Sequence, residues 1–189
     1  MSDPIVERLH MVSPLSDLSR ENLSAIVKRK DVKKGAHLVR IGKEVTDFFF
    51  IAYGLARVYY VRNGEDVTDY FACDGDFIGA VPALFTGGRS NKAVETLEDS
   101  EVYHFSYAEF ERLCLENHDI ERAGRRLAVL AFLDVQQRIE DMRFLSARER
   151  YELLETRHPG ITNRLPLRHV ASYLGTTNVS ISRIRAGKQ

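Results

Sequence analysis

The sequence predicts an α+β fold in which an antiparallel β domain is followed by a long helix and a small helical domain. Residues 32–102 hold short runs rich in β-branched and aromatic residues, separated by glycines. Residues 120–144 repeat apolar residues at three- and four-residue steps, which is typical of one long helix. Residues 167–186 place small and apolar residues around Gly175, as two short helices joined by a tight turn do.

A short amphipathic helix is expected before the β domain. Leu18, Leu23, Ile26 and Val27 are spaced for one helical face and follow Ser and Asp residues suited to capping. In the β domain, four runs are strand-like, and Asn63-Gly64 predicts a tight hairpin turn between the second and the third. These runs are residues 48–51, 56–61, 67–72 and 101–105. The pattern favours a compact antiparallel barrel or sandwich.

The long helix is expected to extend beyond the β domain. Roughly 25 residues span almost 40 Å at about 1.5 Å per residue, more than a barrel of some 70 residues covers. Its apolar residues at 128, 131, 135, 139 and 142 therefore favour contact with a second subunit, giving a homodimer. A helix packed wholly on its own barrel is the alternative. We place the domains at 1–118, 119–144 and 145–189.

Composition narrows the classes of protein. The chain has 44% hydrophobic and 29% charged residues, as soluble globular proteins have. It shows neither a bilayer-spanning stretch nor a signal peptide, so we expect a cytoplasmic protein with no membrane partner. Cys73 and Cys114 are isolated, which argues against a metal or disulfide site and favours buried, inert thiols. No motif of catalytic residues occurs, so we expect no enzyme.

Charge is distributed unevenly along a chain whose net charge is zero. Residues 161–189 contain five basic residues and no Asp or Glu, which is the footprint of a module that binds phosphates. In this segment Val170, Leu174, Ile181 and Ile184 are expected to form the core shared by the two helices. Ala171 permits their close crossing, and Thr177 is suited to cap the second helix.

With the isoleucines turned inward, the start of the second helix presents residues suited to the DNA major groove. Asn178 is suited to adenine, Arg183 to guanine or a phosphate, and Val179 to a thymine methyl group. Further phosphate contacts are expected from basic and hydroxyl side chains. The predicted DNA-binding residues are Thr177, Asn178, Val179, Ser180, Ser182, Arg183, Arg168, Arg185 and Lys188.

The order of motifs resembles the CRP/FNR regulators. These join a cyclic-nucleotide-binding-type β-roll to a dimerisation helix and a C-terminal helix-turn-helix. The resemblance covers nearly the whole chain and rests on Lys34-Gly35, residues 51–58, Gly75-Asp76-Phe77-Ile78-Gly79, residues 97–102 and the helix-turn-helix. It implies a β-roll or jelly-roll sensor domain and a winged-helix-like DNA-binding domain. The expected partners are double-stranded DNA, a second copy of the chain, RNA polymerase and a small-molecule effector.

The resemblance places the effector pocket at Gly79, Ala80, Val81, Arg89, Ser90 and Asn91. Members that bind cyclic AMP carry a glutamate where this chain has Ala80, and their arginine position falls near Ser90 or Asn91 here. Without those charges the ribose and the cyclic phosphate lose their main partners. We therefore expect no cofactor and no cyclic nucleotide. The expected function is dimeric, sequence-specific regulation of transcription; the alternative is a ligand-binding or protein-interaction β-roll that does not bind DNA.

Overall fold

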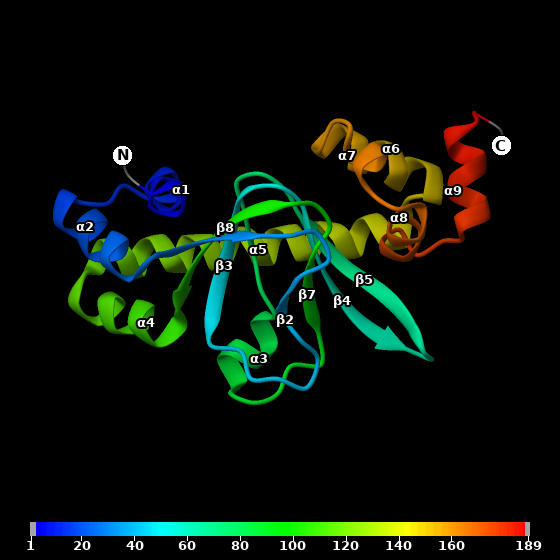
Figure 1. Cartoon of the computed structure of the whole chain (residues 1–189). Helices are drawn as coiled ribbons and strands as arrows, with labels where there is room; N and C mark the ends of the chain where they lie inside the picture. The colour runs from blue at the N-terminus through cyan, green and yellow to red at the C-terminus, as the bar shows by residue number, and fades with distance from the viewer. Residues whose placement is uncertain (1–2, 188–189) are drawn as a thin grey trace. The chain divides into compact units, whose positions relative to one another are not determined.

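The computed structural model describes residues 3–187 and divides into two compact units (Figure 1). The first unit takes in Met1–Tyr60 and Tyr70–Leu130, and the second Val61–Asp69 and Ala131–Gln189. The second unit thus includes the tip of a β-hairpin whose strands begin and end in the first. The long helix α5 (His118–Phe144) contributes to both units.

Two four-stranded sheets form the β domain, in the orders β1-β8-β3-β6 and β2-β7-β4-β5. The pairings β1–β8, β3–β8, β3–β6, β2–β7 and β4–β7 are antiparallel, which confirms the antiparallel jelly-roll-like prediction. The strands are β1 (Lys28–Val32), β2 (His37–Val39), β3 (Asp47–Tyr53), β4 (Ala56–Arg62), β5 (Glu65–Ala72), β6 (Asp76–Ile78), β7 (Ala93–Thr96) and β8 (Ser100–Ser106).

Alternating side chains of β3 build two separate cores. Phe49 and Ile51 are buried between the sheets, where they join Val102 of β8. Phe50 points to the opposite face and packs with Phe105 beneath the helices of the first unit. This follows from the two-residue period of a strand, which sends successive side chains to opposite faces.

Four further helices belong to the first unit: α1 (Pro4–Val12), α2 (Asp17–Ile26), α3 (Val81–Thr86) and α4 (Tyr107–Glu116). The expected early helix is confirmed as α2, which buries Leu23 and Ile26. The prediction for Leu18 is wrong: this residue is 64% exposed, because the buried face of α2 is formed by Ser19, Leu23 and Ile26. Cys73 is buried as expected, whereas Cys114 is only half-buried, and burial raises the pKa of its thiol to about 11.

The predicted hairpin turn lies between β4 and β5. Asn63 and Gly64 both adopt positive φ, at 54° and 81°, as the two central residues of a type I′ turn require. Asn and Gly tolerate this conformation at the least steric cost. The turn therefore sets where β4 ends and β5 begins.

The second unit is helical beyond the hairpin tip. It contains α6 (Ala147–Arg157), α7 (Ile161–Arg164), α8 (Leu167–Tyr173) and α9 (Asn178–Arg185). Up to residue 187, no strand follows β8, so the wing implied by the resemblance has no counterpart in the described residues. Among those residues, no helix combines the length and apolarity needed to cross a membrane.

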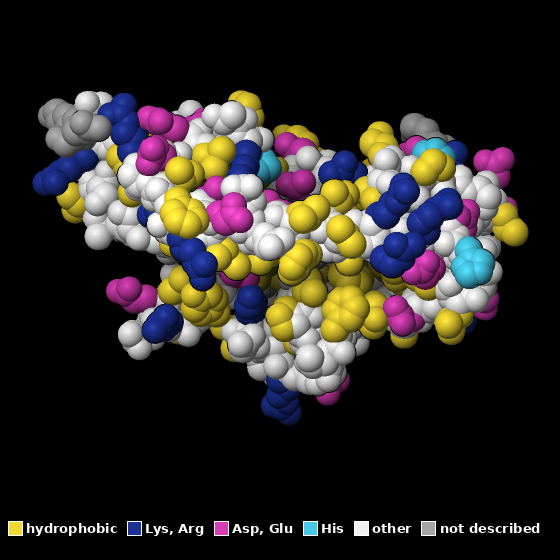
Figure 2. Space-filling view, turned by 180° about the vertical axis from the view of Figure 1, so that it is seen from behind, with side chains coloured by type: hydrophobic (Ala, Val, Ile, Leu, Met, Phe, Trp, Pro, Cys, Tyr) yellow, Lys and Arg dark blue, Asp and Glu magenta, His cyan; other side chains and the backbone are white. Residues whose placement is uncertain are grey.

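The exposure of apolar side chains increases along helix α5. Ile120 and Ala123 are buried in the first unit and Leu127 is half-buried against the same core, but most of the large apolar side chains from residue 129 onward are exposed. Figure 2 shows hydrophobic side chains gathered along this helix. We call this set the α5 stripe: Val129, Leu130, Phe132, Leu133, Val135, Ile139, Met142 and Phe144, each at least 42% exposed.

Asp119 joins the start of α5 to the start of α2. Its carboxylate accepts hydrogen bonds from the Ser16 N–H (2.8 Å), the Ser19 hydroxyl (2.6 Å) and the Ile120 N–H (3.0 Å). Burial raises the pKa of Asp119, but these hydrogen bonds outweigh it and lower the pKa to about 2. The ionised carboxylate thus stabilises the helical end of the first unit.

We predict that Asp119→Asn lowers the free energy of unfolding by about 1 kcal/mol at pH 6, as loss of a helix cap does. The folded-state pKa lies below the unfolded value. The contribution is therefore complete above about pH 4 and is lost as pH falls toward 2. Urea unfolding between pH 6 and pH 2.5 checks this: the gap between the wild-type and variant stabilities must narrow as the pH falls. A gap that stays constant with pH would contradict it.

Candidate nucleic-acid interface and effector region

Helices α8 and α9 share a small apolar core across a four-residue turn. Val170, Leu174 and Ile181 are buried, as the sequence predicted, while Ile184 is half-buried. Ala171 is also buried, which lets the two helices approach closely. The apolar side of α9 is therefore fixed and its opposite side faces outward.

The turn uses the two residues expected to shape it. Gly175 has a φ of 63°, a conformation that L side chains rarely adopt. Thr177 is the N-cap of α9, and its hydroxyl accepts the Ser180 N–H at 3.1 Å. This bond satisfies one of the free N–H groups at the start of the helix.

Most of the predicted DNA-binding residues lie on one exposed surface at and after this cap. Thr177, Asn178, Val179, Ser182 and Arg183 are exposed, and Val179 leaves 60% of its apolar side chain accessible. We call these five residues the α9 face. No acidic residue interrupts α9, and Asn178 and Ser182 lie one helical turn apart.

The remaining predicted contacts differ from this set. Ser180 is half-buried and its hydroxyl pairs with that of Thr177 at 3.0 Å. Arg168 is exposed on α8, and Lys188 lies outside the described residues. Arg185 donates from Nε to the Tyr151 hydroxyl at 3.3 Å and from Nη2 to the Thr162 carbonyl. Its guanidinium is thus partly committed within the second unit.

A side chain of α6 holds the end of α8, and an ion pair joins α6 to α5. Arg150 of α6 donates two hydrogen bonds to the Leu174 carbonyl, at 3.1 and 2.9 Å, and so caps the end of α8. Asp141 of α5, which is buried, binds Arg157 of α6 at 3.1 Å. Neither arginine is predicted by the sequence, since nothing local distinguishes it from a surface cation.

The hairpin tip contacts the same helix. In the sheet order β5 is an edge strand, whose outer N–H and C=O groups need partners. The Thr68 N–H donates to the Ser172 hydroxyl of α8 at 3.2 Å, and Arg138 of α5 donates to the Asp69 carbonyl at 3.0 Å. These contacts explain why residues 61–69 cluster with the helices of the second unit.

The predicted effector residues lie around α3 in the first unit. Ala80, at the start of α3, is 1% exposed and belongs to the core between the sheets. Gly79 exchanges two hydrogen bonds with the Tyr70 hydroxyl, at 2.9 and 3.1 Å. The buried Ser90 hydroxyl donates to the Lys92 carbonyl at 2.7 Å and accepts the Lys92 N–H. Val81, Arg89 and Asn91 are exposed.

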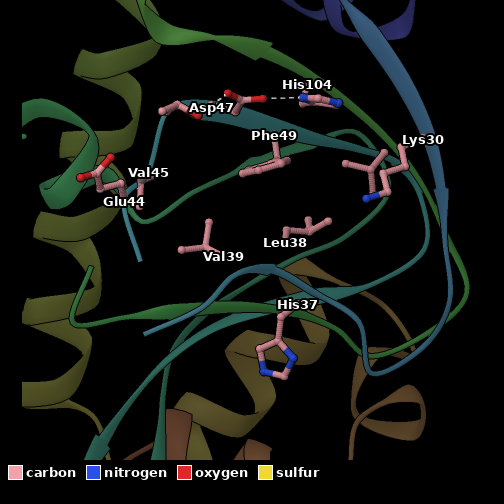
Figure 3. A pocket seen from close by; sticks show the side chains of 11 residues that line it. Lys30, His37, Leu38, Val39, Glu44, Val45, Asp47, Phe49 and His104 are labelled. Atoms are coloured by element: carbon pink, nitrogen blue, oxygen red, sulfur yellow. Dashed lines mark hydrogen bonds and ion pairs between the residues drawn. The ribbon is translucent and has the colours of Figure 1, made fainter. Parts of the chain in front are cut away.

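A cavity of about 250 Å³ opens elsewhere in the β domain, between residues of β1, β2, β3 and β8. The Asp47 carboxylate and His104 Nδ1 are hydrogen-bonded at 2.6 Å at its edge, and Figure 3 shows Phe49, Leu38 and Val39 below this pair. The predicted effector residues are absent from its lining. The two regions adjoin, because Glu44 of the lining pairs with Arg89 in an isolated antiparallel bridge.

Comparisons with known proteins fit this geometry. Residues 29–117 match the family model of the cyclic nucleotide-binding domain. A chain from Eubacterium rectale described as a CRP/FNR-family transcriptional regulator superposes with a TM-score of 0.73 at 16% identity, covering 96% of this chain and 87% of its own. FixK2 from Bradyrhizobium japonicum gives 0.71 at 17% identity, covering 86% and 84%.

The c-di-GMP-responsive global regulator CLP of Xanthomonas campestris gives a TM-score of 0.68 at 16% identity, with 91% of each chain covered. No curated protein matches the sequence. At these identities the likeness establishes the fold. Residues 29–117 thus match the cyclic nucleotide-binding domain, and the chain shares its fold with proteins described as CRP/FNR-family and global regulators.

Proposed function

We propose that this protein is a sequence-specific DNA-binding transcriptional regulator whose α8–α9 pair is a helix-turn-helix. The observation that carries the proposal is the α9 face, which exposes Asn178, Val179, Ser182 and Arg183 while the other side of α9 is buried on α8. A capped helix with an exposed polar N-terminal turn suits the major groove. The fold shared with CRP/FNR-family regulators supports the same function.

Within this proposal the exposed residues divide into two roles. Asn178 is suited to bidentate pairing with adenine and Arg183 to guanine, whereas Val179 supplies an apolar contact for a thymine methyl group. Arg168, on α8, is suited to phosphates, which position the protein without reading sequence. Because the segment from residue 161 contains no acidic residue, no side chain there opposes phosphate binding.

We predict that DNA sites selected from a random pool are bound in a salt-dependent way, and that Asn178→Ala weakens binding by about 1–3 kcal/mol and relaxes one base position. Arg183→Ala should also lower the slope of log K against log salt when Arg183 contacts a phosphate. Arg112→Ala removes an exposed charge on α4 and serves as the control. Gel retardation and fluorescence anisotropy measure these effects. Failure of the wild type to retard DNA at low salt contradicts the proposal.

We infer further that two chains associate through the α5 stripe. Apolar patches of this extent rarely remain uncovered in a monomer. Phe132, Val135, Ile139 and Met142 follow the three- and four-residue steps of a two-helix seam. A two-fold dimer also presents two α9 faces, and paired recognition helices about 34 Å apart would read two half-sites.

We predict that the wild type is a dimer at micromolar concentration and that the double variant Phe132→Glu, Ile139→Glu is a monomer. Each glutamate would bury a charge at the seam, which costs several kcal/mol. Leu115→Glu places the same charge on a 90% exposed residue of α4 and should leave the dimer intact. Light scattering coupled to size-exclusion chromatography gives the mass. A monomeric mass for the wild type would contradict the proposal that two chains associate through the α5 stripe.

We also propose that an effector other than a cyclic nucleotide controls the protein from the β domain, near α3. Ala80 supplies no carboxylate for a ribose, and the Ser90 hydroxyl is bonded to the Lys92 backbone. The supporting structural fact is that residue 80 is enclosed in the core rather than directed into an open site. RNA polymerase is a further partner that this function implies.

We predict that about 1 mM cyclic AMP changes the melting temperature by less than about 2 °C. A ligand whose Kd exceeds its concentration stabilises the folded state by less than about 0.4 kcal/mol. Differential scanning fluorimetry of the full chain, with cyclic GMP alongside and buffer as the control, tests this. A rise of several degrees that saturates with either nucleotide would mean that the domain binds it without the missing glutamate.

A further inference from the structure

A line of hydrogen bonds joins the last turn of α9 to α6. Arg185 donates from Nε to the Tyr151 hydroxyl at 3.3 Å, which lies 2.9 Å from the Thr162 hydroxyl. Thr162, which is buried, donates in turn to the Glu155 carboxylate. Since the single hydroxyl hydrogen of Thr162 is directed to Glu155, Tyr151 must be the donor to Thr162. The donors therefore all point one way, from a guanidinium to a carboxylate.

The carboxylate end of this line is held by further hydrogen bonds. Glu155 also accepts the Gly160 N–H at 2.9 Å and the Thr162 N–H at 3.0 Å, so it closes the start of α7 as well. Burial raises the pKa of Glu155, but these bonds and the charge of Arg185 outweigh it and keep the pKa low. A charged group at each end strengthens the hydrogen bonds between them.

We propose that Arg185 is a positioning residue that fixes the orientation of α9 through Tyr151, Thr162 and Glu155, rather than a phosphate contact. The inference rests on the proposed DNA-binding function. Its second contact, from Nη2 to the Thr162 carbonyl, holds the guanidinium against α7 as well. Arg185 is exposed, as is Arg183 on the α9 face two residues earlier, but the Nε and Nη2 groups of Arg185 donate hydrogen bonds to Tyr151 and Thr162. On this short helix, Arg185 thus positions α9 and Arg183 is available to DNA.

The position of this contact explains its effect on recognition. Arg185 ends α9 and Asn178 begins it, so about 10 Å of helix separates them. The core of α8 and α9 restrains the middle of the helix through Ile181. Loss of the contact at the far end would let α9 tilt about that point. Base contacts tolerate such a tilt poorly, because bidentate pairing needs correct distance and direction together.

The experiment compares variants of the full chain on a selected DNA site and on random DNA across a salt series. We expect Arg185→Gln and Tyr151→Phe each to lower affinity for the selected site about tenfold, to lower the ratio of specific to random binding, and to leave the salt slope unchanged. Arg185→Lys keeps the charge but lacks the forked geometry, so it should not rescue the ratio. The double variant should be no worse than either single one.

A phosphate contact would give a different pattern and overturn the inference. Arg185→Gln would then reduce the salt slope by about 0.9, Arg185→Lys would bind nearly as the wild type, and Tyr151→Phe would have no effect. A purely stabilising role would also overturn it, because a smaller active fraction leaves the specific-to-random ratio unchanged. Arg183→Lys makes the same substitution at the arginine of the α9 face, and its affinity and salt slope are compared with those of Arg185→Lys.

A measurement without DNA separates this inference from the proposed function. Hydrogen exchange of the α9 amides in the full chain should quicken in Tyr151→Phe, while exchange in α8 changes little. If the wild type binds no DNA, the proposed function fails, and the exchange data still show whether the contact orders α9. Unchanged exchange in α9 would refute the positioning role even in a protein that binds DNA.

Discussion

The pairing of β3 with β8 is the constraint on which the first unit depends. Both strands are central in their sheet, and both bury residues on each face. Phe49 and Val102 belong to the core between the sheets, and Phe50 and Phe105 to the core beneath the helices. A shift of one residue would exchange these faces and disrupt two cores at once. The register of a single strand pair therefore fixes the sheets and the helical cover together.

Strands with long apolar or β-branched runs are predicted by the sequence, whereas a strand without such a run is missed. Strands β3, β4, β5 and β8 are rich in apolar and β-branched residues and were foreseen, as was the Asn63-Gly64 turn. Strand β1, with the sequence Lys-Arg-Lys-Asp-Val, exposes four of its five residues and shows no apolar alternation. Only its pairing with β8 makes it a strand. Tertiary pairing of this kind leaves no local signal.

The same distinction applies to the candidate DNA interface. The sequence predicts the turn at Gly175, the cap at Thr177 and the buried side of α9 at Ile181. Each of these residues acts through its own backbone or its nearest neighbours, so its role has a local signal. The arginines give no such indication. Arg150 and Arg185 resemble any surface cation in sequence, yet one caps α8 and the other bonds α6 and α7. Charge counts therefore predict that a segment is basic without telling which cations are available to a ligand.

The α5 stripe connects these local results to the behaviour of the whole chain. One helix buries Ile120 and Ala123 in the first unit and then exposes eight large apolar side chains, of which Phe132 and Phe144 leave 61% and 80% accessible. Burying one such side chain stabilises by about 1.5–3 kcal/mol, so covering the stripe would contribute far more than any hydrogen bond described above. Since residues 131–144 of the stripe belong to the second unit, association along it would order the same unit that holds α9. In the proposed dimer, association along α5 would therefore be coupled to the proposed DNA recognition by α9.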